Sequence, residues 1–266
     1  MRVLNQGFDN SMEPEEKATA TLAGGIMQHG YQCGMIWGAA LAAGAEAYRL
    51  YGSGSEVESR AVKASQKLVE TFRAQNKHIN CLEITDIDKT ASTLKMVTFF
   101  LLKGGTIGCF RMAAKFAPQA YKEIEETLSQ EIAEFPPQPV SCASLLAKKM
   151  GFSEEHQVMV AGLAGGIGLS GGACGALGAA IWLKGLQSNR ESGEKLDFNN
   201  PATLAAMEKF LEVSDYEFEC SDIVGRQFEN VQDHANYIAC GGCSKILDQL
   251  ANTGAMNSRP EVDDSV

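Results

Sequence analysis

The 266-residue chain has little positive charge: 23 lysines and arginines stand against 33 aspartates and glutamates, a formal net charge of −10. This excess of negative charge argues against binding to nucleic acid or to anionic lipid. The eight cysteines are too few for a disulfide-stapled scaffold of this length, and the first ten residues lack the apolar core of a signal peptide. We therefore expect a cytoplasmic protein whose cysteines serve metal binding or redox chemistry.

Two further patterns are missing. No persuasive alternation of apolar and polar residues indicates a strand, so we expect an all-α fold. The uncharged stretch 158–183 is long enough to span a bilayer, but its eight glycines should break it into two shorter helices. Because broken backbone exposed to lipid is not tolerated, we do not expect a membrane span.

What the chain does contain is a repeat. Segments 23–34 and 164–175 match without a gap at a shift of 141 residues; both begin Ala-Gly-Gly-Ile and end Cys-Gly. Farther along, Cys81 corresponds to Cys220 and Cys109 to Cys243. This self-similarity predicts a tandem duplication of two helical modules. The expected divisions are a degenerate first module at 1–134, a proline-rich linker at 135–139, a complete second module at 140–256 and a disordered acidic tail at 257–266.

Helical periodicity and capping residues predict where the helices lie. The expected helices are 13–24, 33–51, 56–74, 90–102, 109–131, 140–150, 154–163, 174–187, 203–212 and 243–251. Short turns are expected at Cys81 and Cys220, and a polar loop at 188–200. Trp37 and Trp182 are expected to pack inside the fold.

Glycine-rich segments lead four times to a cysteine at or near a predicted helix start, at Cys33, Cys109, Cys174 and Cys243. Glycine permits positive φ and close approach of the backbone. The free N–H groups of a first helical turn favour a thiolate, which would lower the pKa of Cys174 and make it a nucleophile or a metal ligand. The alternative is a buried structural cysteine. Retention of three cysteines in both copies favours a joint chemical role.

Other side chains extend these sites. Cys142 precedes Cys174, and Cys240 forms a Cys-Gly-Gly-Cys motif that could act as a redox dithiol or supply metal ligands. The remaining candidates, His29 and His78, could form a Cys₂His₂ zinc site with Cys33 and Cys81. His156 and His234 are expected at the surface.

The cysteine order resembles the C_GCAxxG_C_C family of putative redox-active proteins. Cys142, the Cys174-Gly-Ala segment, Cys220 and Cys243 match its pattern, and the first module resembles a degenerate copy that has Met1 at the lead-cysteine position. The family is also similar to the non-haem portion of split-Soret cytochromes. The resemblance implies small helical modules and an iron–sulfur centre held by four cysteines.

Three functions follow as hypotheses. The first is electron transfer through a [2Fe–2S]-type cluster on the four matched cysteines, with Cys240 replacing or supporting Cys243. Backbone donors would come from the glycine-rich segments, at Gly171, Gly172, Gly175, Gly241 and Gly242. The second is thiol–disulfide exchange, in which Cys174 attacks and Cys243 or Cys240 resolves. The third is a helical scaffold with structural cysteines.

Partners are also expected. The acidic surface suits docking to a basic redox protein, and small-residue helix faces suit a homo-oligomer. In the first module Cys33, Cys81 and Cys109 are candidate ligands of a second, incomplete site.

Overall fold

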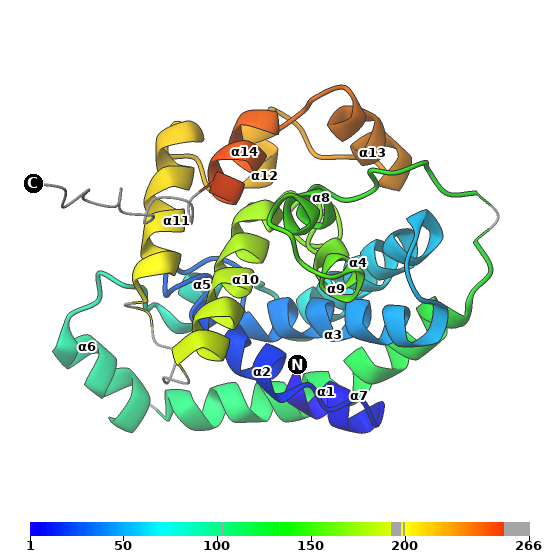
Figure 1. Ribbon diagram of the computed structural model, residues 1–266. Coiled ribbons are helices and arrows are strands. Elements are labelled where there is room, and N and C mark those ends of the chain that lie inside the picture. The colour runs from blue at the N-terminus through cyan, green and yellow to red at the C-terminus, as the bar shows by residue number, and fades with distance from the viewer. Residues whose placement is uncertain (103, 133, 193–197, 199, 253–266) are drawn as a thin grey trace, which may run out of the picture.

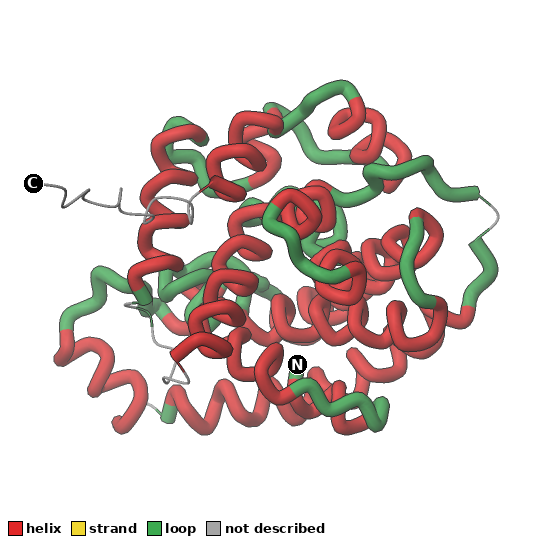
Figure 2. The backbone as a smooth tube through the Cα atoms, in the orientation of Figure 1, coloured by secondary structure: helices red, strands yellow, loops and turns green. Residues whose placement is uncertain are grey.

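The computed structural model describes residues 1–102, 104–132, 134–192, 198 and 200–252, and these form an all-α protein without a β-strand (Figures 1 and 2). Two short helices are not α-helical: the 3₁₀-helix η1 at Thr19–Leu22 and the π-helix η2 at Thr98–Leu102. The α-helices are α1 Arg2–Gly7, α2 Glu13–Ala18, α3 Gly34–Tyr51, α4 Ser55–Asn76, α5 Cys81–Thr85, α6 Thr93–Val97, α7 Gly105–Ser129, α8 Cys142–Lys149, α9 Glu154–Ala161, α10 Gly175–Ser192, α11 Pro201–Val213, α12 Cys220–Val224, α13 Val231–Ala239 and α14 Ser244–Asn252.

The packing of the helices repeats along the chain. We call α1–α7 module one and α8–α14 module two. In module one, α3 contacts α1, α4 and α7; in module two, α10 contacts α8, α11 and α14. The outer pairs α4–α7 and α1–α7 likewise correspond to α11–α14 and α8–α14. The same set of helix pairs therefore forms twice, as a duplicated sequence predicts.

The two modules share one hydrophobic core. Helix α3 packs on α9 of module two, and α10 packs on α2 and η1 of module one. The contacts are close at glycines: a Cβ on Gly44 would lie 2.5 Å from the Val158 carbonyl oxygen, and one on Gly178 would lie 2.2 Å from the Trp37 ring. Trp37 and Trp182 are fully buried in this core, as expected.

A left-handed turn precedes α3 and another precedes α10. Residues 24–28 and 165–169 each hold five consecutive positive φ angles, between 47° and 79°. Such a turn costs roughly 1–2 kcal/mol for each residue with a side chain, so glycine is favoured there. At Gly166 a Cβ would also lie 2.4 Å from the Gly172 carbonyl oxygen. The glycines in these segments therefore allow the positive φ angles and the close contacts between backbone segments that the sequence predicted.

Several helix predictions are wrong in detail. The predicted helix 13–24 is α-helical only to Ala18 and continues as η1 to Leu22. It does not reach residue 24 as a helix, because the glycines after Leu22 adopt the left-handed turn. The predicted helix 90–102 is split between α6 and η2. Helix α10 continues to Ser192, so residues 188–192 are helical rather than part of the expected loop 188–200. Helices α1 and α13 were not expected, because short amphipathic segments give a weak periodic signal.

The length and apolar character of the helices bear on whether the chain could cross a membrane. Within the described residues, no single helix combines enough length and apolar character to cross a membrane. One pair bent by 56°, Thr93–Phe100 with Gly105–Ser129, meets the criteria of length and composition together. The uncharged stretch 158–183 is divided between α9 and α10, as its glycines predict. The expected tail at 257–266 lies outside the described residues.

Candidate functional site

Four cysteines of module two converge, although they are far apart in sequence. Cys142 and Cys220 are the first residues of α8 and α12, while Cys174 and Cys243 directly precede α10 and α14. Burial raises the pKa of Cys220, and the neighbouring thiols of Cys174, Cys142 and Cys243 raise it further. Thiols influence one another in this way only at short range in a poorly hydrated environment. Four helix starts therefore meet at one thiol site, which we call site two.

Main-chain hydrogen bonds fix two of these cysteines. The Cys174 amide donates to the Phe218 carbonyl oxygen at 2.8 Å, and the Cys220 amide donates to the Gly172 carbonyl oxygen at 2.7 Å. These bonds form an isolated antiparallel bridge between Ala173 and Glu219. The turn before α12 is therefore held directly against the glycine-rich loop before α10.

The same bridge occurs in module one, between Gln32 and Asn80. Here the Cys33 amide donates to the Ile79 carbonyl oxygen at 2.8 Å, and the Cys81 amide donates to the Tyr31 carbonyl oxygen at 2.7 Å. Each copy of the duplication thus keeps both the cysteine pair and its backbone frame.

Backbone amides point at two of the four sulfur atoms of site two. The Cys142 thiol receives a hydrogen bond from the Gly165 amide, and the Cys174 thiol receives them from the Leu177 and Ala176 amides. These bonds lower the thiol pKa values because they stabilise negative charge on sulfur. Among the predicted glycines, Gly171 and Gly172 supply carbonyl oxygens that hold the α12 turn, and Gly175 is the first residue of α10.

The expectation of a lowered pKa at Cys174 is wrong. Burial raises its pKa well above the usual value and is the largest cause, ahead of the hydrogen bonds that lower it. The pKa of Cys142 is raised for the same reason. The free energy lost when a thiolate is removed from water exceeds the stabilisation that the amides of a first helical turn provide. In the free protein these buried sulfurs are protonated thiols at neutral pH.

Cys243 is the partly exposed member of site two. Burial raises its pKa to about 11, and a hydrogen bond with the Tyr237 hydroxyl opposes this shift. Gly241 and Gly242 form the turn between α13 and α14, and Cys240 is exposed at the end of α13. Tyr237 was not predicted in the site, because it lies on α13, a helix that the sequence periodicity did not indicate.

Module one brings together three thiols, which we call site one. Burial raises the pKa of Cys33 to about 12, and the thiols of Cys81 and Cys109 contribute. All three are partly exposed. Cys109 lies inside α7 rather than at its start, because the helix begins at Gly105. Site one is thus a more open counterpart of site two.

The histidines do not complete a zinc site. His29 Nε2 lies 3.2 Å from Lys89 Nζ, and His78 Nδ1 lies 3.1 Å from Glu83 Oε1. In the part of the chain that the structure describes, no three His, Cys, Asp or Glu side chains are arranged to hold a metal ion.

The other two histidines were wrongly expected at the surface. His156 is buried with Nε2 at 3.2 Å from Glu15 Oε1. His234 is buried with Nδ1 at 2.9 Å from the Val140 carbonyl oxygen. Both therefore serve contacts within the fold, because helix packing covers them.

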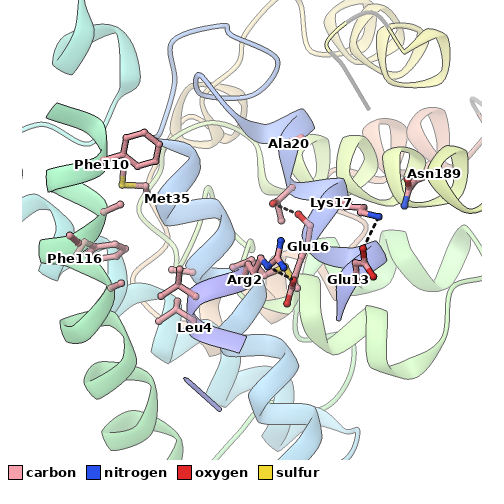
Figure 3. Close-up of a pocket in the computed structure, with 17 residues that line it drawn as sticks. Arg2, Leu4, Glu13, Glu16, Lys17, Ala20, Met35, Phe110, Phe116 and Asn189 are labelled. Atoms are coloured by element: carbon pink, nitrogen blue, oxygen red, sulfur yellow. Dashed lines mark hydrogen bonds and ion pairs between the residues drawn. The ribbon is translucent and has the colours of Figure 1, made fainter. Parts of the chain in front are cut away.

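An apolar cavity of about 950 Å³ lies beside site one, between α1, α2, α3 and α7 (Figure 3). Phe110, Phe116 and Met35 line one end, and the ion pair of Lys17 with Glu13 lies toward the other. No cysteine lines this cavity. It is therefore separate from the thiol site, although Phe110 directly follows Cys109.

These features define a class: an all-α protein with two glycine-framed cysteine sites made by duplication. The chain belongs to the C_GCAxxG_C_C family, described as "Putative redox-active protein", whose model matches residues 1–122 and 140–254. The two matched ranges agree with the tandem duplication. No curated protein and no solved structure matches the chain.

Proposed function

We propose that site two is the redox centre of the protein and that it holds an iron–sulfur cluster for one-electron transfer. The observation that supports this most is the convergence of four cysteines from four helix starts, with backbone amides directed at the sulfur atoms of Cys142 and Cys174. Cysteine thiolates are the usual ligands of such clusters. The family assignment supports redox activity in general.

The number and kind of donors in site two suit an iron–sulfur cluster. In a [2Fe–2S] cluster two cysteines bind each of the two iron atoms, so the two pairs of sulfurs lie farther apart than four sulfurs around one ion. Four mutually influencing thiols supply the number of ligands that such a cluster needs. Raised thiol pKa values do not prevent ligation, because a metal ion removes the proton from a coordinating thiol.

The residues around the site would tune it. When bound, an iron–sulfur cluster supplies reversible uptake and release of one electron. The Gly165, Ala176 and Leu177 amides stabilise negative charge on sulfur, and such hydrogen bonds favour the reduced state. Tyr237 does the same at Cys243. The net charge of −10 supports a basic protein as the redox partner.

The test is anaerobic reconstitution of the full chain with ferrous iron and sulfide, followed by iron and acid-labile sulfide assays and an optical spectrum. We expect the wild type to bind iron and sulfide. Each of Cys142→Ser, Cys174→Ser and Cys220→Ser should lower the bound iron at least fivefold, because a cluster needs all its ligands together. The matched control is Cys240→Ser, which changes an exposed cysteine and should bind as the wild type does. A colourless wild type free of iron would contradict the proposal.

Thiol–disulfide exchange is the second candidate, and the Cys240–Cys243 motif supports it. Cys240 is exposed and Cys243 is partly exposed, with two glycines between them. In this reaction the two thiols would form a disulfide, while the two electrons and two protons released reduce a substrate disulfide to two thiols. Cys240→Ser would abolish exchange but spare iron binding, so the same variant separates the two functions.

A further inference from the structure

Gln32 connects the two thiol sites. This side chain is fully buried and belongs to the residue directly before Cys33. Its Oε1 accepts a hydrogen bond from the Ala173 amide at 3.0 Å, and its Nε2 donates to the Gly166 carbonyl oxygen at 3.1 Å. Ala173 is the residue directly before Cys174. One amide side chain from module one therefore holds the glycine-rich loop of module two.

Gln32 also belongs to the backbone frame of site one. It forms the isolated bridge with Asn80, the residue directly before Cys81. Ala173 forms the equivalent bridge with Glu219, the residue directly before Cys220. The hydrogen bond from Ala173 to Gln32 therefore links two frames, each of which carries two cysteines of its site.

The chain is shaped to admit this contact. A Cβ on Gly172 would lie 1.8 Å from Gln32 Nε2, so only glycine leaves room for the side chain. The position equivalent to Gln32 in module two is Ala173, whose methyl group cannot return the contact. The duplication has thus become asymmetric here, and module one contacts the loop of module two without a reciprocal bond.

We propose that Gln32 couples the two sites, so that a chemical change at site one alters the reactivity of the cysteines in site two. The path from Cys33 to Cys174 consists of one peptide link, the Gln32 side chain, one hydrogen bond and a second peptide link. A shift of Cys33 moves Gln32, and Gln32 moves the loop that presents Cys174. Coupling between sites requires such a shared element, whose position both sites affect. This inference concerns the thiols themselves and does not depend on a bound cluster.

A double-mutant cycle tests the coupling in the full chain. Site one is changed by Cys33→Ser, and the readout is the rate at which iodoacetamide labels Cys174 and Cys220, followed by peptide mass spectrometry. With Gln32 in place, we expect Cys33→Ser to change these rates at least threefold. In the Gln32→Met background, which keeps the size but removes both hydrogen bonds, the same change should alter them by less than 1.5-fold.

Controls keep the result interpretable. Gln157→Met removes a comparable hydrogen bond, from Gln157 Nε2 to the Phe152 carbonyl oxygen, and should leave the coupling intact. If Gln32→Met does not fold, Gln32→Leu replaces it, since it also removes the acceptor for the Ala173 amide and the donor to Gly166. Equal responses with and without Gln32, or no response to Cys33→Ser, would overturn the inference. Because labelling needs no iron, failure of the proposed cluster would leave this result unaffected.

Discussion

The sulfur atoms of Cys174 and Cys220 lie at helix starts and are almost completely excluded from water. At Cys174 two effects act in opposite directions on the pKa of the thiol. The amides of the first helical turn favour a thiolate, whereas the loss of hydration favours a neutral thiol. Burial prevails at Cys174, and at Cys220 burial and the neighbouring thiols both raise the pKa. A free thiolate nucleophile is therefore not the resting state of these sulfurs.

Single glycines hold the loops that carry these cysteines. Gly166 has φ +79°, and its Cβ would lie 2.4 Å from the Gly172 carbonyl oxygen. We expect Gly166→Ala to lower the free energy of unfolding by at least about 2 kcal/mol, because conformational cost and a backbone clash add. Chemical denaturation measures it. Gly151→Ala is the control, since Gly151 has φ +78° and nothing near its Cβ; a loss equal to that at Gly166 would contradict the clash.

At the scale of elements, short helices position the site. Helices α5 and α12 contain five residues each, too few to be stable alone. They persist because the bridges at Asn80 and Glu219 attach them to the neighbouring loops. Their cysteines are consequently positioned by tertiary hydrogen bonds rather than by helix propensity.

Capping residues stabilise the longer helices that support these turns. Asn200 Oδ1 accepts hydrogen bonds from the Ala202 and Thr203 amides at the start of α11. We expect Asn200→Ala to lower the free energy of unfolding by about 1 kcal/mol, because two helix amides lose their acceptor. Urea denaturation provides the measurement. Lys209→Ala, on an exposed part of the same helix, should change it by less than about 0.5 kcal/mol; similar losses for both variants would exclude a capping role.

At the scale of the whole molecule, the modules are joined by buried contacts of several kinds. Gln32 reaches into module two, α3 packs on α9, and Glu58 of α4 is buried beside Gln138, whose Nε2 donates to Glu58 Oε1 at 3.2 Å. Burial raises the pKa of Glu58 to about 7. The stability of the assembled fold should therefore depend on pH through this carboxyl group.

The sign of this dependence follows from proton binding. Between pH about 4.5 and about 7 the folded state holds a proton on Glu58 that the unfolded chain has lost. The contribution of protonated Glu58 to the free energy of unfolding is fully present below pH 4.5 and is lost as pH rises through about 7. We expect Glu58→Gln to gain stability relative to wild type with rising pH, by up to about 3 kcal/mol. Thermal unfolding at pH 4 to 8 checks this.

A matched control isolates the effect of burial. Glu70 is exposed and paired with Lys67, so Glu70→Gln should show little change with pH relative to wild type. A Glu58→Gln difference that stays constant from pH 4 to 8 would contradict the raised pKa.

The fold could be predicted largely from local pattern. Helix periodicity placed the cores of α3, α4 and α10, and the repeated Ala-Gly-Gly-Ile segment predicted the duplication that the family match and the repeated packing confirm. The glycines predicted positive φ, because no other residue enters that region without cost. Short elements such as α1 and α13 escaped prediction, since two turns of helix carry too little periodic signal.

The amino-acid sequence by itself determined where the cysteines and the glycines of positive φ stand, because cysteine identity and glycine conformation are properties of single positions. Only the tertiary structure decided how those residues meet and what environment they share. It joined Gln32 to Ala173, brought Tyr237 to Cys243, and raised the cysteine pKa values by burial. These outcomes depend on groups far apart in sequence whose distance and hydration are set when the helices pack, and a linear pattern contains neither quantity.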